Sequence, residues 1–222
     1  MSTYVLMRIL ESAPSRYDLG IRLLTLGCLD RAYDRLASHV EDGQQVMDLG
    51  CGTGALALRA ARRGGKVKAI DINARMLEIA AQRAREAGLA ESVTFVEMGV
   101  AELDGEKAEK YDAVMSGLCF SELSEDERAY TLRQVGRILR PGGLLLVADE
   151  VKPRTLAARV VQSLARTPLV VLAYLITQQT THPIAELPKR LTEAGLTILS
   201  VKSGALQSFI ELVAQKPAGV VP

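Results

Sequence analysis

A glycine-rich turn between a strand and a helix constrains the fold of this chain more than any other feature. Residues 45–48 read as a short buried strand, residues 55–63 read as a helix, and the sequence LGCGTG at residues 49–54 joins them. Glycine lets the backbone turn tightly and approach a ligand closely. The start of a helix adds free N–H groups and a partial positive charge. The turn therefore predicts an α/β protein with a small-molecule site at this point.

Strands and helices alternate along the rest of the chain. Further strands are expected at 67–71, 93–98, 111–116, 144–148, 196–202 and 209–214, and helices at 74–87 and after the capping box Ser124–Glu127. The sequence PGG at 141–143 is expected to end that second helix. This alternation is typical of a parallel sheet with helices on both faces. No helix separates the last two strands, so we expect them to pair antiparallel.

The predicted fold class is therefore α/β, a Rossmann-like three-layer sandwich. Its seven-stranded sheet is mostly parallel, with an antiparallel last strand and an N-terminal helical cap. A length of 222 residues favours one domain. The expected parts of residues 1–222 are a helical cap at 1–42, the ligand-binding core at 43–150, a helical lid at 151–190 and the final strand pair at 191–217.

Composition and charge exclude several classes of protein. Apolar residues make up 48% of the chain and charged residues 24%, which is ordinary for a folded protein and excludes a disordered one. The net charge of +1 gives no support to nucleic-acid binding, which needs a broad basic surface. Three scattered cysteines and two histidines show no metal-ligand spacing, so no metal site is expected.

Two segments bear on location and partners. Residues 1–14 lack the pattern of a signal peptide, and the apolar run at 169–177 is far shorter than the roughly 20 residues of a membrane span. We therefore expect a cytoplasmic protein without a transmembrane segment. Residues 151–185 hold four basic side chains and no acidic one, which fits either a helical lid or a surface for an anionic or lipophilic partner, including a membrane surface. The oligomeric state stays open.

The charges around the turn limit the class of ligand that the site can bind. The spacing Gly-x-Gly-x-Gly differs from that of dinucleotide sites, and Asp48, two residues before the first glycine, would repel a pyrophosphate. A ligand with both an ammonium and a carboxylate fits better, and S-adenosyl-L-methionine (SAM) carries both. Asp71 ends the second strand, 23 residues after Asp48, where a carboxylate can accept ribose hydroxyls. Met76 is expected to pack on the adenine.

Three motifs carry a resemblance to a known family. DLGCGTG at 48–54, DIN at 71–73 and RPGG at 140–143 resemble the class I SAM-dependent methyltransferases, nearest the type-11 group with the ubiquinone/menaquinone-biosynthesis methyltransferases. The resemblance implies SAM as cofactor, S-adenosyl-L-homocysteine (SAH) as product and a small or lipophilic methyl acceptor. The residues that it implies for cofactor binding are Asp48, Gly50, Cys51, Gly52, Thr53, Gly54, Asp71, Ile72, Asn73, Met76, Val100, Ala101, Glu102, Ser116, Gly117 and Leu118.

The chain departs from the family after the third strand. The family shows Gly-Asp-Ala there, with the Asp accepting the adenine amino group, whereas this chain reads Gly99-Val100-Ala101-Glu102. Val100 has no acceptor for that bond. The Ala101 N–H can still meet an adenine ring nitrogen. Glu102 is either the partner of the amino group or a solvated loop carboxylate.

Candidates for catalysis are few. Relatives carry histidine near Ser121-Glu122 and this chain does not, so Glu122 is the remaining candidate base, with a carboxylate at the start of a helix as the alternative. Asp149 and Glu150 are further candidates, with helix capping or pairing with the lid as the alternative. Cys119 is expected near the transferred methyl group, as a buried small residue or as a reactive thiolate or metal contact. The resemblance puts Tyr17 over the cofactor pocket, where it either closes the site or is a core tyrosine.

A second resemblance concerns a partner. Residues 16–21, 116–123 and 148–151 are similar to methyltransferases associated with corrinoid proteins, which implies a corrinoid protein as partner. The leading hypothesis is a methyltransferase for a small or lipophilic acceptor. Its alternatives are such a corrinoid-associated enzyme and a SAM-binding regulatory protein without turnover.

Overall fold

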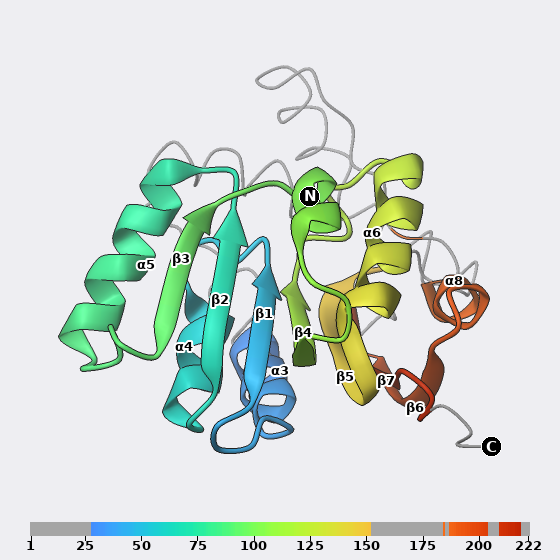
Figure 1. The fold of residues 1–222 in the computed structure, drawn as a ribbon, viewed down its shortest axis with the longest axis horizontal. Coiled ribbons are helices and arrows are strands. Elements are labelled where there is room, and N and C mark those ends of the chain that lie inside the picture. The colour runs from blue at the N-terminus through green and yellow to red at the C-terminus, as the bar shows by residue number, and fades with distance from the viewer. Residues whose placement is uncertain (1–27, 152–183, 185–186, 204–208, 219–222) are drawn as a thin grey trace.

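The computed structural model describes residues 28–151, 184, 187–203 and 209–218 (Figure 1). The first 27 residues of the expected cap, including Tyr17, and most of the expected lid lie outside the described residues. The division into cap, core, lid and strand pair therefore stays a prediction.

The described residues form the expected seven-stranded sheet, in the order β3-β2-β1-β4-β5-β7-β6 (Figure 1). The first five strands pair parallel, and β7 runs antiparallel to both β5 and β6. The strands are β1 (Gln45–Leu49), β2 (Lys66–Asp71), β3 (Val93–Glu97), β4 (Tyr111–Gly117), β5 (Leu139–Glu150), β6 (Thr197–Ser203) and β7 (Phe209–Gln215). The Rossmann-like fold class is confirmed.

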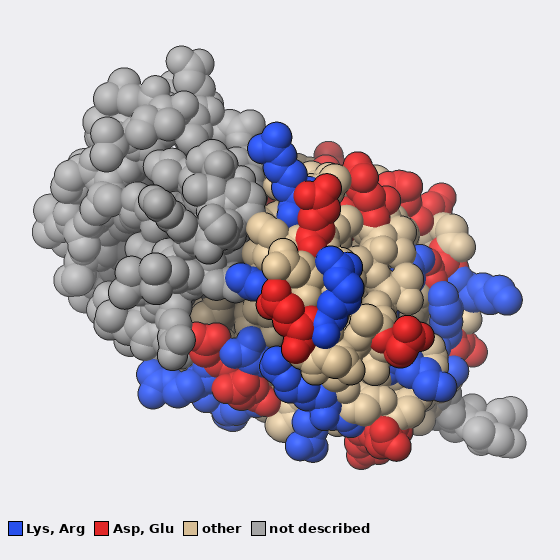
Figure 2. Space-filling view, turned by 90° about the vertical axis from the view of Figure 1, so that its left-hand side faces the viewer, with Lys and Arg blue, Asp and Glu red and all other residues tan. Residues whose placement is uncertain are grey.

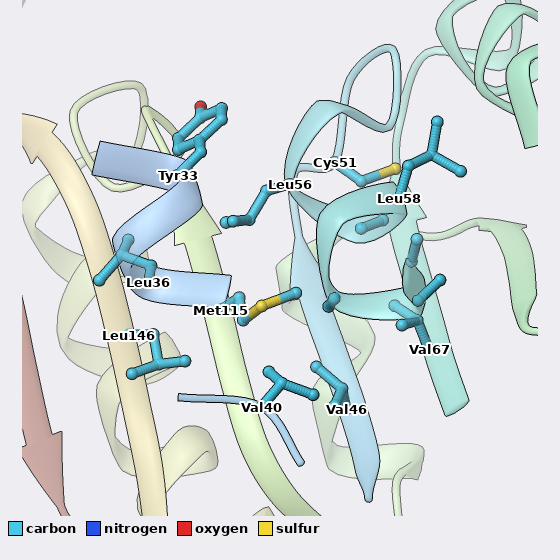
Figure 3. Packing of buried hydrophobic residues seen from close by; sticks show 14 of the residues in the cluster. Tyr33, Leu36, Val40, Val46, Cys51, Leu56, Leu58, Val67, Met115 and Leu146 are labelled. Carbon is cyan, nitrogen blue, oxygen red and sulfur yellow. The ribbon is translucent and has the colours of Figure 1, made fainter. Parts of the chain in front are cut away.

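Helices cover both faces of this sheet. The helices among the described residues are α3 (Cys28–Ala37), α4 (Ala55–Arg62), α5 (Ala74–Glu86), the 3₁₀ helix η1 (Val100–Gly105), α6 (Glu125–Ile138) and α8 (Leu187–Glu193). One buried cluster joins α3, α4 and α5 to the sheet, and Figure 3 shows α3 and α4 side chains packed against strand residues such as Val46 and Met115. A second cluster joins η1, α6 and α8 to the other face. The chain is thus a three-layer sandwich.

Local side-chain bonds fix where two of the helices begin. Ser124 and Glu127 form the expected capping box at the start of α6, with the Ser124 N–H donating to Glu127 at 2.8 Å. The Asn73 Oδ1 accepts hydrogen bonds from the N–H groups of Arg75 and Met76 at 3.1 and 3.4 Å, which caps α5. Both helices consequently start beside the carboxyl ends of the strands.

The expected boundary between α6 and the fifth strand is wrong. The strand does not start after the PGG sequence but at Leu139, directly after α6, so that Pro141 and the two glycines lie within β5. The residue before a proline favours extended backbone, which ends the helix early. The Gly142 N–H then donates to the Lys216 carbonyl at 2.9 Å, and the Lys216 N–H donates to the Gly143 carbonyl at 2.9 Å. These bonds extend the sheet past the proline.

One face of the described residues mixes both signs of charge. Figure 2 shows Lys and Arg side chains interspersed with Asp and Glu over the described part of one face. No continuous basic field lies on that described face, in keeping with the net charge of +1.

A buried ionic cluster ties the sheet to the segment after η1. Glu106 accepts hydrogen bonds from Lys110 at 2.9 Å and from the Tyr111 hydroxyl at 2.7 Å, and it also pairs with Lys68 of β2. Burial opposes the charge on Glu106, but the bonds from Lys68, Lys110 and Tyr111 outweigh it and lower the pKa to about 2. The folded state therefore holds this carboxylate in its ionised form.

We expect Glu106→Gln to lower the free energy of unfolding at pH 7 by about 1–3 kcal/mol, the scale of hydrogen bonds to a charged group. Because the pKa falls from 4.5 to about 2 on folding, the contribution is complete above 4.5 and is lost as the pH falls toward 2. Urea unfolding between pH 3 and 7 measures both effects. Glu78→Gln, on the exposed side of α5, is the control. Equal stability of the two variants at pH 7 would contradict the prediction.

Candidate functional site

The glycine-rich turn packs directly against the loop after β4. Gly50 has a φ of +64°, and a Cβ on it would lie 2.7 Å from the Cys119 Sγ and 2.8 Å from the Cys119 Cβ. A side chain at residue 50 is therefore excluded both by backbone conformation and by space. The chain needs glycine here because two loops from neighbouring strands meet at this point.

The Asp71 carboxylate holds the turn from the other side. Its Oδ2 accepts a hydrogen bond from the Gly52 N–H at 2.8 Å, and its Oδ1 accepts one from the Asn73 N–H at 2.8 Å. Burial raises the pKa of Asp71, and these backbone hydrogen bonds partly offset that rise. The end of β2 thereby fixes the position of the glycine-rich turn after β1.

A pocket of about 410 Å³ opens at this edge of the sheet. The expected cofactor residues that line it are Gly50, Gly52, Asp71, Ile72, Asn73, Met76, Gly117 and Leu118, and the candidate base Glu122 lines it too. The expected residues outside its lining are Asp48, Cys51, Thr53, Gly54, Val100, Ala101, Glu102 and Ser116. Residues that line it without having been singled out are Ala74, Arg75 and Glu97, and Cys119 completes the wall.

Ile72 gives the pocket an apolar wall. Its side chain is 75% exposed, more than the other exposed large apolar side chains in the described part of the chain. It lies beside Gly99, where an added Cβ would be 3.4 Å from the Ile72 Cγ2. When a flat ring covers an apolar side chain in a pocket, apolar surface is removed from water, and this favours binding of the ring.

Asp48 is buried behind the turn. Its side chain is 1% exposed, and neither carboxylate oxygen has a hydrogen-bond partner in the described structure. The pKa of Asp48 is raised to about 8, mainly by burial. The backbone of Ala57 lowers this pKa in part, and the negative charge of Asp71 raises it further. Since Asp48 does not line the pocket, its charge would act on a bound ammonium from behind the turn.

The residues expected to bind the adenine form hydrogen bonds within the protein. Glu102 accepts a hydrogen bond from the Gly99 N–H at 2.9 Å and so satisfies a backbone donor at the start of η1. The Tyr130 hydroxyl donates to the Ala101 carbonyl at 3.1 Å. The expected cofactor residue Ser116 is fully buried, and its hydroxyl has no hydrogen-bond partner among the described residues. The Gly-x-x-Glu spacing is a sequence signal for the capping role of Glu102.

The loop after β4 is held in a strained conformation. Leu118 has a φ of +62°, which costs a non-glycine residue about 1–3 kcal/mol. The Leu118 N–H donates to the Ala148 carbonyl at 2.8 Å, and the buried Arg128 donates to the Phe120 and Leu123 carbonyls at 3.1 and 2.6 Å. This network holds the loop that carries Cys119 and Glu122 along the pocket.

Asp149 supports this loop from β5. It is fully buried, and its Oδ2 accepts a hydrogen bond from the Ser121 N–H at 3.3 Å. Burial and the charges of Glu122 and Asp149 raise the pKa of the Cys119 thiol. Burial also raises the pKa of Cys51. Both thiols are therefore protonated at neutral pH, which disfavours the reactive-thiol alternative for Cys119.

A family model described as a methyltransferase domain matches residues 46–143. The ubiquinone/menaquinone biosynthesis C-methyltransferases UbiE of Proteus mirabilis and Vibrio vulnificus are 32% and 31% identical to the chain over 152 residues. These matches cover 66% of this chain and 59% and 57% of the two relatives. The chain thus spans less than two thirds of the length of these relatives.

Solved structures show the same fold. A SAM-dependent methyltransferase from Aquifex aeolicus has a TM-score of 0.66 at 19% identity, with 93% of this chain and 98% of the other covered. An O-methyltransferase family protein from Burkholderia thailandensis has a TM-score of 0.71 at 18% identity, with 93% and 60% covered. The [4+2]-cyclase SpnF has a TM-score of 0.68 at 23% identity, with 86% and 81% covered. At these identities the likeness concerns the fold alone.

Sequence, fold and family model agree on one class. Residues 46–143 match the methyltransferase domain, and the sheet has the fold of the class I SAM-dependent methyltransferases, whose cofactor is SAM. Within this class, the chain's named relatives include the UbiE C-methyltransferases. No helix in the described ranges is long and apolar enough to span a membrane. Among the same residues, no three His, Cys, Asp or Glu side chains form a metal-binding group.

We expect Gly50→Ala to lower the free energy of unfolding by about 2–4 kcal/mol and to abolish SAH binding, because the new methyl group meets both Cys119 atoms. The double variant with Cys119→Gly removes those atoms and should recover about half of the lost stability, with the backbone strain of about 1–2 kcal/mol left. Thermal unfolding and titration calorimetry measure the two effects. A double variant no more stable than Gly50→Ala would contradict the packing argument.

We expect Asp48→Asn to stabilise the ligand-free protein at pH 9 by on the order of 2 kcal/mol, and to weaken SAH binding. A carboxyl with a pKa of 3.8 when unfolded and about 8 when folded favours the folded state in its protonated form. Wild-type stability should therefore fall as the pH rises from 4 to 9, and the variant should lose this slope. Unfolding measured at pH 6 and pH 9 tests this. An unchanged slope would contradict it.

Proposed function

We propose that this chain transfers the methyl group of SAM to a small lipophilic acceptor and releases SAH. One observation carries the proposal: the pocket brings together the glycine-rich turn, the Asp71 carboxylate and the exposed Ile72 at the carboxyl edge of a class I methyltransferase sheet. Ligands of parallel α/β sheets bind at this edge.

The chemistry of the pocket residues supports the following arrangement of SAM. The turn at 50–54 borders its carboxylate, with Gly50 the donor we assign to it, because the N–H groups of Cys51, Gly52 and Gly54 already donate within the protein. Asp48 favours its ammonium from behind the turn. Asp71 has remaining lone pairs for ribose hydroxyls, since each of its oxygens accepts one backbone N–H. Ile72 and Met76 offer apolar surface to the adenine. The Ala101 N–H donates a hydrogen bond to an adenine ring nitrogen.

Methyl transfer asks little chemistry of the protein. SAM supplies an activated methyl group and its own leaving group. The chain aligns the acceptor with that methyl group, keeps water away and takes up a proton where the acceptor loses one. Glu122 is our candidate base for that proton, because this residue lines the pocket together with Cys119. Tyr17 stays a candidate for closing the pocket.

The names of the relatives support an acceptor of quinone type. Two of them act, by name, as C-methyltransferases in ubiquinone and menaquinone biosynthesis. We extend this to a lipophilic aromatic ring as acceptor for this chain. The corrinoid-protein partner stays a hypothesis from the sequence, which these relatives do not support. A cytoplasmic location and peripheral contact with a membrane also stay predictions.

The proposal predicts binding of SAH at micromolar concentration and transfer of label from methyl-labelled SAM to the lipid fraction of a cell extract. Asp71→Ala should weaken SAH binding by about 1.5–3 kcal/mol, the scale of hydrogen bonds to a charged group, and abolish the transfer. Asp104→Ala, an exposed change in η1, is the matched control and should leave both unchanged.

The location of the label separates the rivals. Label in lipid supports the proposal, whereas label in a protein fraction with corrinoid absorbance would replace the acceptor by a corrinoid partner. Tight SAH binding without transfer to any fraction would favour the regulatory alternative. A wild-type chain that binds no SAH would overturn the proposal.

A further inference from the structure

Glu97 and Asp71 end two neighbouring strands at the pocket. Glu97 is the last residue of β3, Asp71 is the last residue of β2, and the two are register partners in a parallel pair. Register partners on adjacent strands point to the same face of the sheet, with their backbones about 4.8 Å apart. Both residues line the pocket. A second carboxylate thus accompanies the one that holds the glycine-rich turn.

The two carboxylates differ in how many hydrogen bonds they accept within the protein. Each oxygen of Asp71 already accepts a backbone N–H, from Gly52 and from Asn73. Glu97 is exposed, and its carboxylate has no hydrogen bond or ion pair within the described part of the chain. Four lone-pair positions of Glu97 are consequently open to donors from a ligand.

Glu102, an acid on the loop after β3, has a structural bond. Its carboxylate accepts the Gly99 N–H at the start of η1. The donors of a nucleoside bound at Asp71 include two neighbouring ribose hydroxyls, and a carboxylate one strand away is within reach of such a diol. Glu97 also has one more methylene than Asp71, which extends its carboxylate farther from the sheet.

We propose that Glu97 is a second ribose-binding residue, which accepts a hydrogen bond from one of the two hydroxyls while Asp71 holds the other. This inference rests on the proposed function, because it assumes that SAM occupies the pocket. It also assigns a specificity. Two carboxylates beside the diol repel a phosphate on either hydroxyl, so the pocket selects an unphosphorylated ribose.

Glu97→Ala tests the assignment, with Glu91→Ala as the matched control. Glu91 is an exposed acid just before the start of β3, so its removal changes the net charge equally at the far end of the same strand. Calorimetric titration with SAH should show binding weakened about threefold to tenfold by Glu97→Ala and unchanged by Glu91→Ala. Thermal unfolding of both variants should match the wild type, because both side chains are exposed.

Competition with nucleosides identifies the bond. Glu97→Ala should weaken adenosine by the same factor as SAH, and should leave unaffected whichever of 2′-deoxyadenosine and 3′-deoxyadenosine lacks the hydroxyl that Glu97 binds. Equal weakening of all three nucleosides would show a general charge effect and overturn the hydrogen bond. Equal SAH affinity of the Glu97 and Glu91 variants would overturn the inference alone. Absence of SAH binding to the wild type would instead overturn the proposed function.

Discussion

The hydrogen bond from the Gly52 N–H to the Asp71 carboxylate is the interaction on which the rest of the site depends. It joins the turn after β1 to the end of β2, and the contact of Gly50 with Cys119 joins the same turn to the loop after β4. Three neighbouring strands therefore have their carboxyl ends locked at one point. The pocket lies where these three segments diverge.

The same arrangement lowers the stability of the ligand-free protein and favours ligand binding. Asp48 is buried without a hydrogen-bond partner in the described structure, and Leu118 has a left-handed backbone conformation. Both features cost free energy in the empty protein. A bound ammonium would stabilise the charged form of Asp48, so ligand binding repays part of that cost. The ionic cluster around Glu106 stabilises the sheet away from the pocket.

Local patterns predicted much of the fold. The capping box at Ser124 marks the start of α6, and the hydrophobic segments mark strands that the sheet contains. The sequence did not predict features that depend on contacts between residues far apart along the chain. The early start of β5 depends on its bonds with Lys216, 73 or more residues along the chain from the glycines that it meets. Glu97 becomes a site candidate only through its register with Asp71, although the sequence already placed both residues in predicted strands.

The two halves of the pocket differ in how the chain encodes them. The cofactor half is built by residues 48–76, in which a turn, a strand end and a helix cap lie close together in sequence and so form a readable motif. The half beside Glu122 is held by Arg128 and by Ala148 and Asp149 of β5. Such bonds leave no short motif, since many sequences can supply a buried guanidinium and a carbonyl. A methyltransferase domain can therefore keep its cofactor motif while its acceptor changes, and the motif predicts the class of reaction but not the acceptor.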